Sequence, residues 1–174
     1  MVGMIANLRT IPRVRLVALA IVAVSVGAIA MAFVAQYAFG LEPCILCLYQ
    51  RVPFALAAVL AAVALLPFTR GQVSLWLTTA CGIVFLAGSA LAFYHVGVEE
   101  HWWASVAACG GAPSTGLSVE DLADQLASGP QKPCDEVNWR LFGLSLAGYN
   151  VLISFALGVV TIACARSLGR KANG

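Results

Sequence analysis

The sequence has little charge: only 10% of its 174 residues are Asp, Glu, Lys or Arg, while 61% are hydrophobic. A soluble domain needs about 25% charged residues to cover its surface, so this composition excludes a soluble fold and indicates a membrane protein. The sequence also lacks internal repeats and low-complexity tracts. The formal net charge of +2 says little by itself, and we predict no nucleic-acid partner.

Long apolar runs occur instead, and each is near the ~20 residues that cross ~30 Å of hydrocarbon. We therefore predict an all-α membrane protein, a four-transmembrane-helix bundle that forms one domain over residues 1–174. A barrel is not favoured, because the runs are continuous and not alternating. The predicted spans cover about residues 16–39, 47–68, 73–98 and 141–164. Pro53 lies inside the second span, which predicts a local kink or a later start of that helix.

The placement of charge predicts the orientation. Seven of the ten basic residues lie in the two termini and in the short segment 69–72, whereas all eight acidic residues lie in the other two connections. By the positive-inside rule, both termini are cytoplasmic, and the periplasmic loops are about 40–46 and 99–140. The predicted spans contain no acidic residue, so ion-coupled transport lacks an obvious coupling group.

The most informative stretch is Pro43-Cys44-Ile45-Leu46-Cys47-Leu48-Tyr49-Gln50-Arg51, at the expected membrane surface. A CxxC pair closes a small disulfide ring, and a helix N-terminus or a nearby cation lowers the pKa of such thiols. The pattern favours redox chemistry, with a structural disulfide or half of a zinc site as alternatives.

Arg51 lies four residues after Cys47, on the same helical face. A guanidinium there is suited to hydrogen-bond a quinone carbonyl and to stabilise the charge that develops as the ring accepts electrons. The alternative is an arginine that snorkels to the interface. His95 ends the third span near the same expected depth, where it either lines a quinone pocket or is satisfied between helices.

The second outward loop contains two further cysteines, Cys109 and Cys134. If they are bonded to each other, they either staple the loop or act as a shuttle disulfide that exchanges with the CxxC pair. Between them, Ser118 and the acidic residues after it predict the start of a short amphipathic helix on the membrane surface.

These features resemble the DsbB family of bacterial disulfide-bond formation proteins. The resemblance depends on the CxxC with Arg51, on Cys109 and Cys134 in the second outward loop, and on Phe142-Gly143-Leu144, which is expected to open the fourth span. It covers nearly the whole chain. Where the family often has Pro and Trp early in this span, the chain has Ala147 and Tyr149.

The resemblance implies a protein-dithiol:quinone oxidoreductase of the bacterial inner membrane, with redox loops that face the periplasm. A reduced DsbA-like periplasmic protein would attack a Cys109–Cys134 disulfide, and these cysteines would then reduce Cys44–Cys47. That pair would pass electrons to ubiquinone or menaquinone near Arg51, with Cys44 as the cysteine nearer the quinone. Cys44, Cys47, Cys109 and Cys134 are the implied catalytic residues.

Two rival interpretations remain open. A DsbI-like oxidase dedicated to one client shares this chemistry and differs only in its partner. A zinc-binding membrane scaffold would instead use the four outward cysteines as ligands. The vitamin K epoxide reductase-like proteins are disfavoured, because their loop cysteines precede the CxxC, whereas here they follow it.

Overall fold

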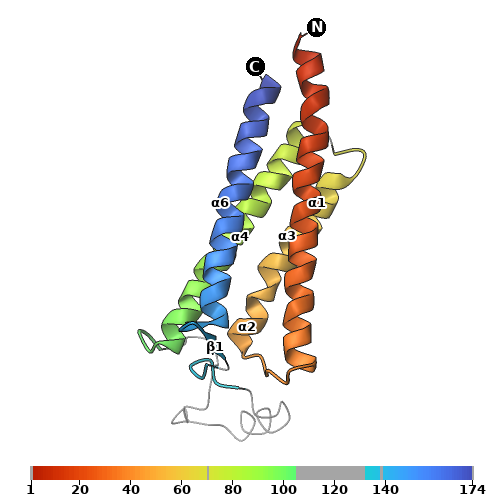
Figure 1. Cartoon of the computed structure of the whole chain (residues 1–174). Helices are drawn as coiled ribbons and strands as arrows, with labels where there is room; N and C mark the ends of the chain where they lie inside the picture. The colour runs from red at the N-terminus through yellow and green to blue at the C-terminus, as the bar shows by residue number, and fades with distance from the viewer. Residues whose placement is uncertain (1, 70, 105–131, 138, 174) are drawn as a thin grey trace, which may run out of the picture.

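The fold is a bundle of long helices, seen in a computed structural model that describes residues 2–69, 71–104, 132–137 and 139–173 (Figure 1). The helices are α1 (Val2–Tyr37), α2 (Ile45–Tyr49), α3 (Arg51–Leu65), α4 (Gln72–Glu99) and α6 (Leu146–Asn173). Four helical segments of the described chain are long and apolar enough to cross a membrane. These segments are Arg13–Tyr37, Ile45–Leu65, Gln72–Glu99 and Leu146–Lys171. The prediction of an all-α chain with four membrane-length helices is confirmed.

Both chain termini lie at one end of the bundle, and α2 lies at the opposite end (Figure 1). This arrangement is what four antiparallel spans require. It puts the CxxC turn far from the termini, as the sequence predicted. The assignment of the two ends to cytoplasm and periplasm remains a prediction.

The second span is interrupted at Gln50, which lies between α2 and α3. The cause is Pro53, because a proline has no N–H to donate to the carbonyl four residues earlier, that of Tyr49. Starting α3 at Arg51 leaves Pro53 in its first turn, where a missing donor costs little. The predicted irregularity near Pro53 is confirmed, and it turns Gln50 inward, where it is buried.

A two-stranded antiparallel hairpin precedes the last helix, with β1 (Arg140–Leu141) paired to β2 (Leu144–Ser145). Its two turn residues, Phe142 and Gly143, have φ values of 50° and 82°, the left-handed pair that a type I′ turn needs. The predictions that span 4 begins at 141 and that Phe142-Gly143-Leu144 opens it are therefore wrong. Apolar composition alone did not distinguish this turn from the helix that follows it.

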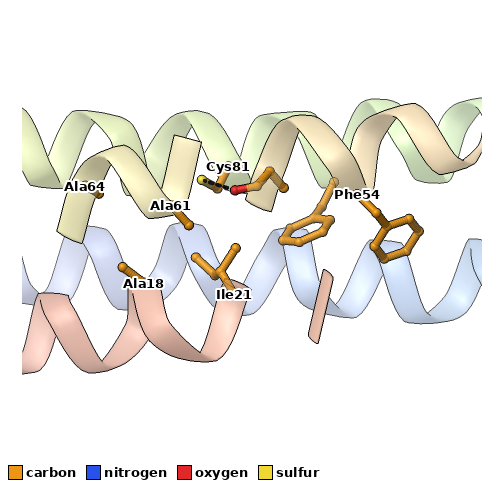
Figure 2. Packing of buried hydrophobic residues seen from close by; sticks show 8 residues of the cluster. Ala18, Ile21, Phe54, Ala61, Ala64 and Cys81 are labelled. Atoms are coloured by element: carbon orange, nitrogen blue, oxygen red, sulfur yellow. Dashed lines mark hydrogen bonds between the residues drawn. The ribbon is translucent and has the colours of Figure 1, made fainter. Parts of the chain in front are cut away.

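The core between α1, α3 and α4 is built from small side chains and two phenylalanines (Figure 2). Phe54 and Phe85 meet edge to face with ring centroids 5.7 Å apart. The Cys81 thiol donates to the carbonyl of Ala57 at 3.6 Å. Small residues let helix backbones approach closely without a hydrophobic driving force from water.

Helix α4 packs most extensively against α6, and Gly82 and Gly158 face each other at this crossing. A Cβ atom on Gly158 would come within 3.0 Å of the Gly82 carbonyl oxygen. The two backbones therefore approach closely at this crossing, and near the CxxC turn Gln50 links His95 of α4 to Asn150 of α6. The amphipathic helix predicted from Ser118 lies outside the described residues.

Candidate dithiol site

The CxxC turn begins the second span, and Cys44 is the N-cap of α2. Its sulfur accepts a hydrogen bond from the backbone N–H of Cys47 at 3.4 Å. The two sulfurs are 3.2 Å apart, and both cysteines are free thiols. Cys44 is buried, whereas Cys47 is only partly buried. The turn therefore holds two reactive sulfurs at contact distance with different surroundings.

Cys44 is the sulfur that carries the negative charge more readily. The hydrogen bond from the Cys47 thiol is the largest cause that lowers the pKa of Cys44 well below its ordinary value. Burial opposes this shift, and a hydrogen bond from His95 and the N–H of Cys47 add to it. The thiolate is the nucleophile and the better leaving group in disulfide exchange, so Cys44 is set up for that reaction.

His95, near the end of α4, lies against the buried side of Cys44. Its Nε2 atom is 3.5 Å from the Cys44 sulfur and 3.7 Å from Oε1 of Glu99. Glu99 is itself buried in the last turn of α4 and accepts a hydrogen bond from the Ser145 hydroxyl. Helix α4 thus extends one residue past the predicted span of 73–98 and includes Glu99. A buried carboxylate therefore stands next to the histidine.

A chain of polar side chains leads from His95 into α6. Gln50 Nε2 is 2.7 Å from His95 Nδ1, and Asn150 Nδ2 donates to Gln50 Oε1 at 2.6 Å. The Ser154 hydroxyl donates to Asn150 Oδ1 at 2.8 Å. When Gln50 donates to Nδ1, the ring proton is on Nε2 and points to Cys44 and Glu99. The chain thus fixes the imidazole in place.

Cys47 and Arg51 both line a cavity of about 320 Å³. Arg51 donates to Gln36 Oε1 at 2.9 Å, and its guanidinium lies over the Phe33 ring, 5.0 Å from the centroid. These contacts anchor the cation at the cavity wall. The lining is mostly apolar and consists of Ala28, Ile29, Met31, Ala32, Ala35, Leu41, Glu42, Pro43, Cys47, Gln50, Arg51, Phe54, Leu146, Ala147, Tyr149, Asn150 and Ile153.

Of the two cysteines in the segment that follows α4, Cys134 is buried and disulfide-bonded. It packs in one buried cluster with Cys44, Leu46 and Val98. A disulfide-bonded cysteine from the segment between α4 and β1 therefore packs beside the dithiol. Cys109 lies outside the described residues, so its pairing with Cys134 stays a prediction.

The structure brings five of the six predicted site residues to the same end of the bundle, and the sixth, Cys109, is not described. Cys44 contacts His95 and is in one buried cluster with Cys134, and it is not among the residues that line the cavity. Cys47 packs against that same cluster and also lines the cavity with Arg51. If the cavity receives the quinone, the expectation that Cys44 is the nearer cysteine is reversed.

Sequence reasoning missed the polar side chains that support this site. Asn150 and Ser154 lie four residues apart in an apolar run, so both fall on one helical face. Gln50 lies next to Arg51 at the mouth of its span. Uncharged polar residues inside apolar runs were the available signal, because such groups need partners within the bundle.

Comparison with known proteins gives a consistent result. The sequence model of the family described as "Disulfide bond formation protein DsbB" matches residues 14–164. A disulfide bond formation protein B of Marinobacter nauticus is 34% identical over 145 residues, which cover 79% of this chain and 82% of that protein. The one of Aromatoleum aromaticum is 32% identical over 164 residues, covering 90% and 93%.

An uncharacterised protein of Rickettsia prowazekii is 27% identical over 147 residues, which cover 83% of this chain and 84% of that protein. No solved structure matches the chain significantly.

The lowered pKa of Cys44 predicts that its thiolate persists as the pH falls below neutrality in the reduced protein. Replacing His95→Ala should move this titration to higher pH, because one hydrogen bond to the thiolate is lost. The measurement is the ultraviolet absorbance of the thiolate, taken as the difference from Cys44→Ser. Cys81→Ser is the matched control and should leave the titration unchanged. An ordinary thiol titration of Cys44, near pH ~8.5, would contradict the account of this site.

Proposed function

Because the chain belongs to the DsbB family of disulfide bond formation proteins, we propose that it reoxidises a DsbA-like periplasmic thiol oxidase and passes the electrons to a membrane quinone. Family membership makes it a disulfide oxidoreductase. The observation that carries the more specific proposal is the two-sided dithiol. Cys44 packs with the disulfide-bonded Cys134, and Cys47 lines a cavity beside Arg51.

Electrons enter through the second outward loop. A dithiol of the soluble partner reduces a disulfide between Cys109 and Cys134 by thiol–disulfide exchange and leaves oxidised. A loop thiolate then attacks Cys44 in the Cys44–Cys47 disulfide, and Cys47 leaves as a thiolate. The mixed disulfide of Cys44 is resolved by the second loop cysteine, which restores the loop disulfide and leaves Cys44 and Cys47 reduced.

The surroundings of Cys44 suit the second exchange. Its thiolate is the leaving group when the mixed disulfide is resolved, and a leaving thiol with a low pKa leaves faster. Hydrogen bonds from Cys47 and His95 provide that low pKa. A free Cys44–Cys47 pair next to a disulfide-bonded Cys134 corresponds to the state after this exchange and before the electrons move on.

Electrons leave through the cavity. Its volume is at the lower end of the ~300–1,000 Å³ usual for small-molecule sites, and its mostly apolar lining suits the head group of ubiquinone or menaquinone. Arg51 and Asn150 can donate hydrogen bonds to ring oxygens. Oxidation of the dithiol to the Cys44–Cys47 disulfide releases two electrons and two protons, which convert a quinone to its quinol.

The position of the site supports an orientation as well. The dithiol lies at the end of the bundle opposite both termini, and the basic residues gather at the termini (Figure 1). We therefore assign the dithiol end to the periplasmic face of the bacterial inner membrane and the termini to the cytoplasm. A DsbA-like protein is accessible only from that face.

The alternatives differ in what they require. A DsbI-like oxidase dedicated to one client would use the same site, and the soluble partner alone separates it from this proposal. A zinc scaffold needs four free outward thiolates, whereas Cys134 is disulfide-bonded. That observation favours the oxidoreductase.

The proposed function predicts quinone reduction by the purified protein in anaerobic solution with a reduced DsbA-like protein. Quinone absorbance should fall in step with oxidation of the soluble partner. Cys47→Ser should abolish quinone reduction, because no disulfide can then form at the turn, whereas Cys164→Ser should retain it. Normal turnover by Cys47→Ser would refute the assignment of this pair.

Arg51→Ala should mainly raise the apparent KM for quinone, because it removes a positioning charge from the cavity wall. A hydrogen bond to a charged group contributes about 1.5–3 kcal/mol, which corresponds to roughly a 10- to 100-fold rise. Steady-state kinetics with varied quinone measure this. Arg140→Ala is the matched control, since Arg140 pairs with the exposed Glu100 outside the cavity. An unchanged KM and rate for Arg51→Ala would reassign Arg51 to lipid anchoring.

A further inference from the structure

Three ligand atoms at the dithiol are arranged as a metal site. The sulfurs of Cys44 and Cys47 and a ring nitrogen of His95 all lie within 4.8 Å of one another. A tetrahedral zinc ion with Zn–S bonds of ~2.3 Å and a Zn–N bond of ~2.0 Å separates its ligand atoms by roughly 3.5–3.8 Å. The observed separations are 3.2 Å between the sulfurs and 3.5 Å from Cys44 to Nε2. Little movement is needed to reach that geometry.

We propose that the reduced protein binds one Zn²⁺ ion through Cys44, Cys47 and His95, and that this ion locks the dithiol in its reduced state. The donor set of two thiolates and one imidazole is typical of Zn²⁺ among the divalent metals. Two thiolates balance the charge of the ion, and the Glu99 carboxylate, 3.7 Å from Nε2, adds negative charge beside it.

The polar side chains that contact His95 can hold the ring both when it binds a metal ion and when it does not. Nε2 binds a metal only when the ring proton is on Nδ1, and that atom faces Gln50 at 2.7 Å. The chain of Gln50, Asn150 and Ser154 can reverse as a unit, because each amide offers a donor and an acceptor and a hydroxyl ends the chain. A histidine that binds a metal ion usually donates a hydrogen bond from its other ring nitrogen to a neighbouring group.

Binding is possible only in one redox state. The ion displaces two protons from the two thiols and changes no oxidation state. In the disulfide both sulfurs are joined at ~2.05 Å, and neither is a thiolate that can bind the ion. With Zn²⁺ in place, the sulfurs cannot form that bond, so the two electrons stay on the protein. The inference rests on the proposed function for this inhibition, but the binding itself does not.

This site differs from a zinc scaffold built on the four outward cysteines. It uses a histidine from α4 in place of the loop cysteines. It cannot bind the ion while Cys44 and Cys47 are joined in a disulfide. Zn²⁺ would act as a reversible inhibitor of a working oxidoreductase and not as a structural element.

The test titrates Zn²⁺ against a chromophoric chelator, without oxygen, using the full chain in detergent. In the background variant, the other cysteines are serine, which leaves Cys44 and Cys47 alone; the replaced positions are Cys81, Cys109, Cys134 and Cys164. We expect one Zn²⁺ per reduced chain and at least ~10-fold weaker binding after oxidation to the disulfide. His95→Ala should weaken binding at least ~10-fold. His101→Asn, at an exposed histidine with positive φ, should not change it.

Equal binding by the reduced and oxidised chains, or by His95→Ala and its parent, would overturn the proposal. A second measurement uses the chain with all six cysteines and follows quinone reduction. Zn²⁺ should slow it, and EDTA should restore it, with a weaker effect in His95→Ala relative to its own rate. Quinone reduction at an unchanged rate in the presence of Zn²⁺ would overturn the proposal that Zn²⁺ inhibits the protein. Zn²⁺ binding with no quinone turnover would overturn the proposed function and leave the metal site standing.

Discussion

The contact between Cys44 and His95 is the constraint on which the site depends. It joins the start of the second span to the end of the third, at 3.5 Å between sulfur and nitrogen. A buried thiolate is costly unless hydrogen bonds compensate for lost water. Here Cys47, through its backbone N–H and its thiol, and His95 supply those bonds, and the Gln50 amide is 2.7 Å from the other ring nitrogen of His95. The arrangement stabilises charge on one chosen sulfur of the pair.

The two sulfurs differ in their surroundings. Cys44 is buried against His95 and is not among the cavity-lining residues, whereas Cys47 packs against the same buried cluster and also lines the cavity with Arg51. Under the proposed function, protein thiols exchange at Cys44 and the lipid-soluble acceptor is reached from Cys47. The interruption of the second span at Gln50 contributes to this arrangement. The Gln50 side chain contacts His95 and Asn150, and Arg51 begins α3 at the cavity. Pro53 accounts for the interruption, which is confined to Gln50 between α2 and α3.

The sequence predicted the four membrane-length helices and the proximity of Cys47 and Arg51, which line one cavity, because hydrophobic length and helical period are local properties. It did not predict the hairpin at Phe142-Gly143, since apolar residues are compatible with both a turn and a helix. The burial of Glu99 was missed for a related reason. A charged residue at the end of an apolar run is expected to be exposed. The sequence does not show that Ser145, from a distant segment, contacts Glu99.

The most direct test of the central claim, that electrons enter at Cys44 from the second outward loop, is a disulfide-trapping measurement. In the double variant Cys47→Ser with Cys109→Ser, the outward cysteines that remain are Cys44 and Cys134. The account predicts that these two form a disulfide with each other under mild oxidation, detected by peptide mapping without reductant. If both thiols stay free while the variant retains its helical fold, the two sulfurs do not meet, and the account is contradicted.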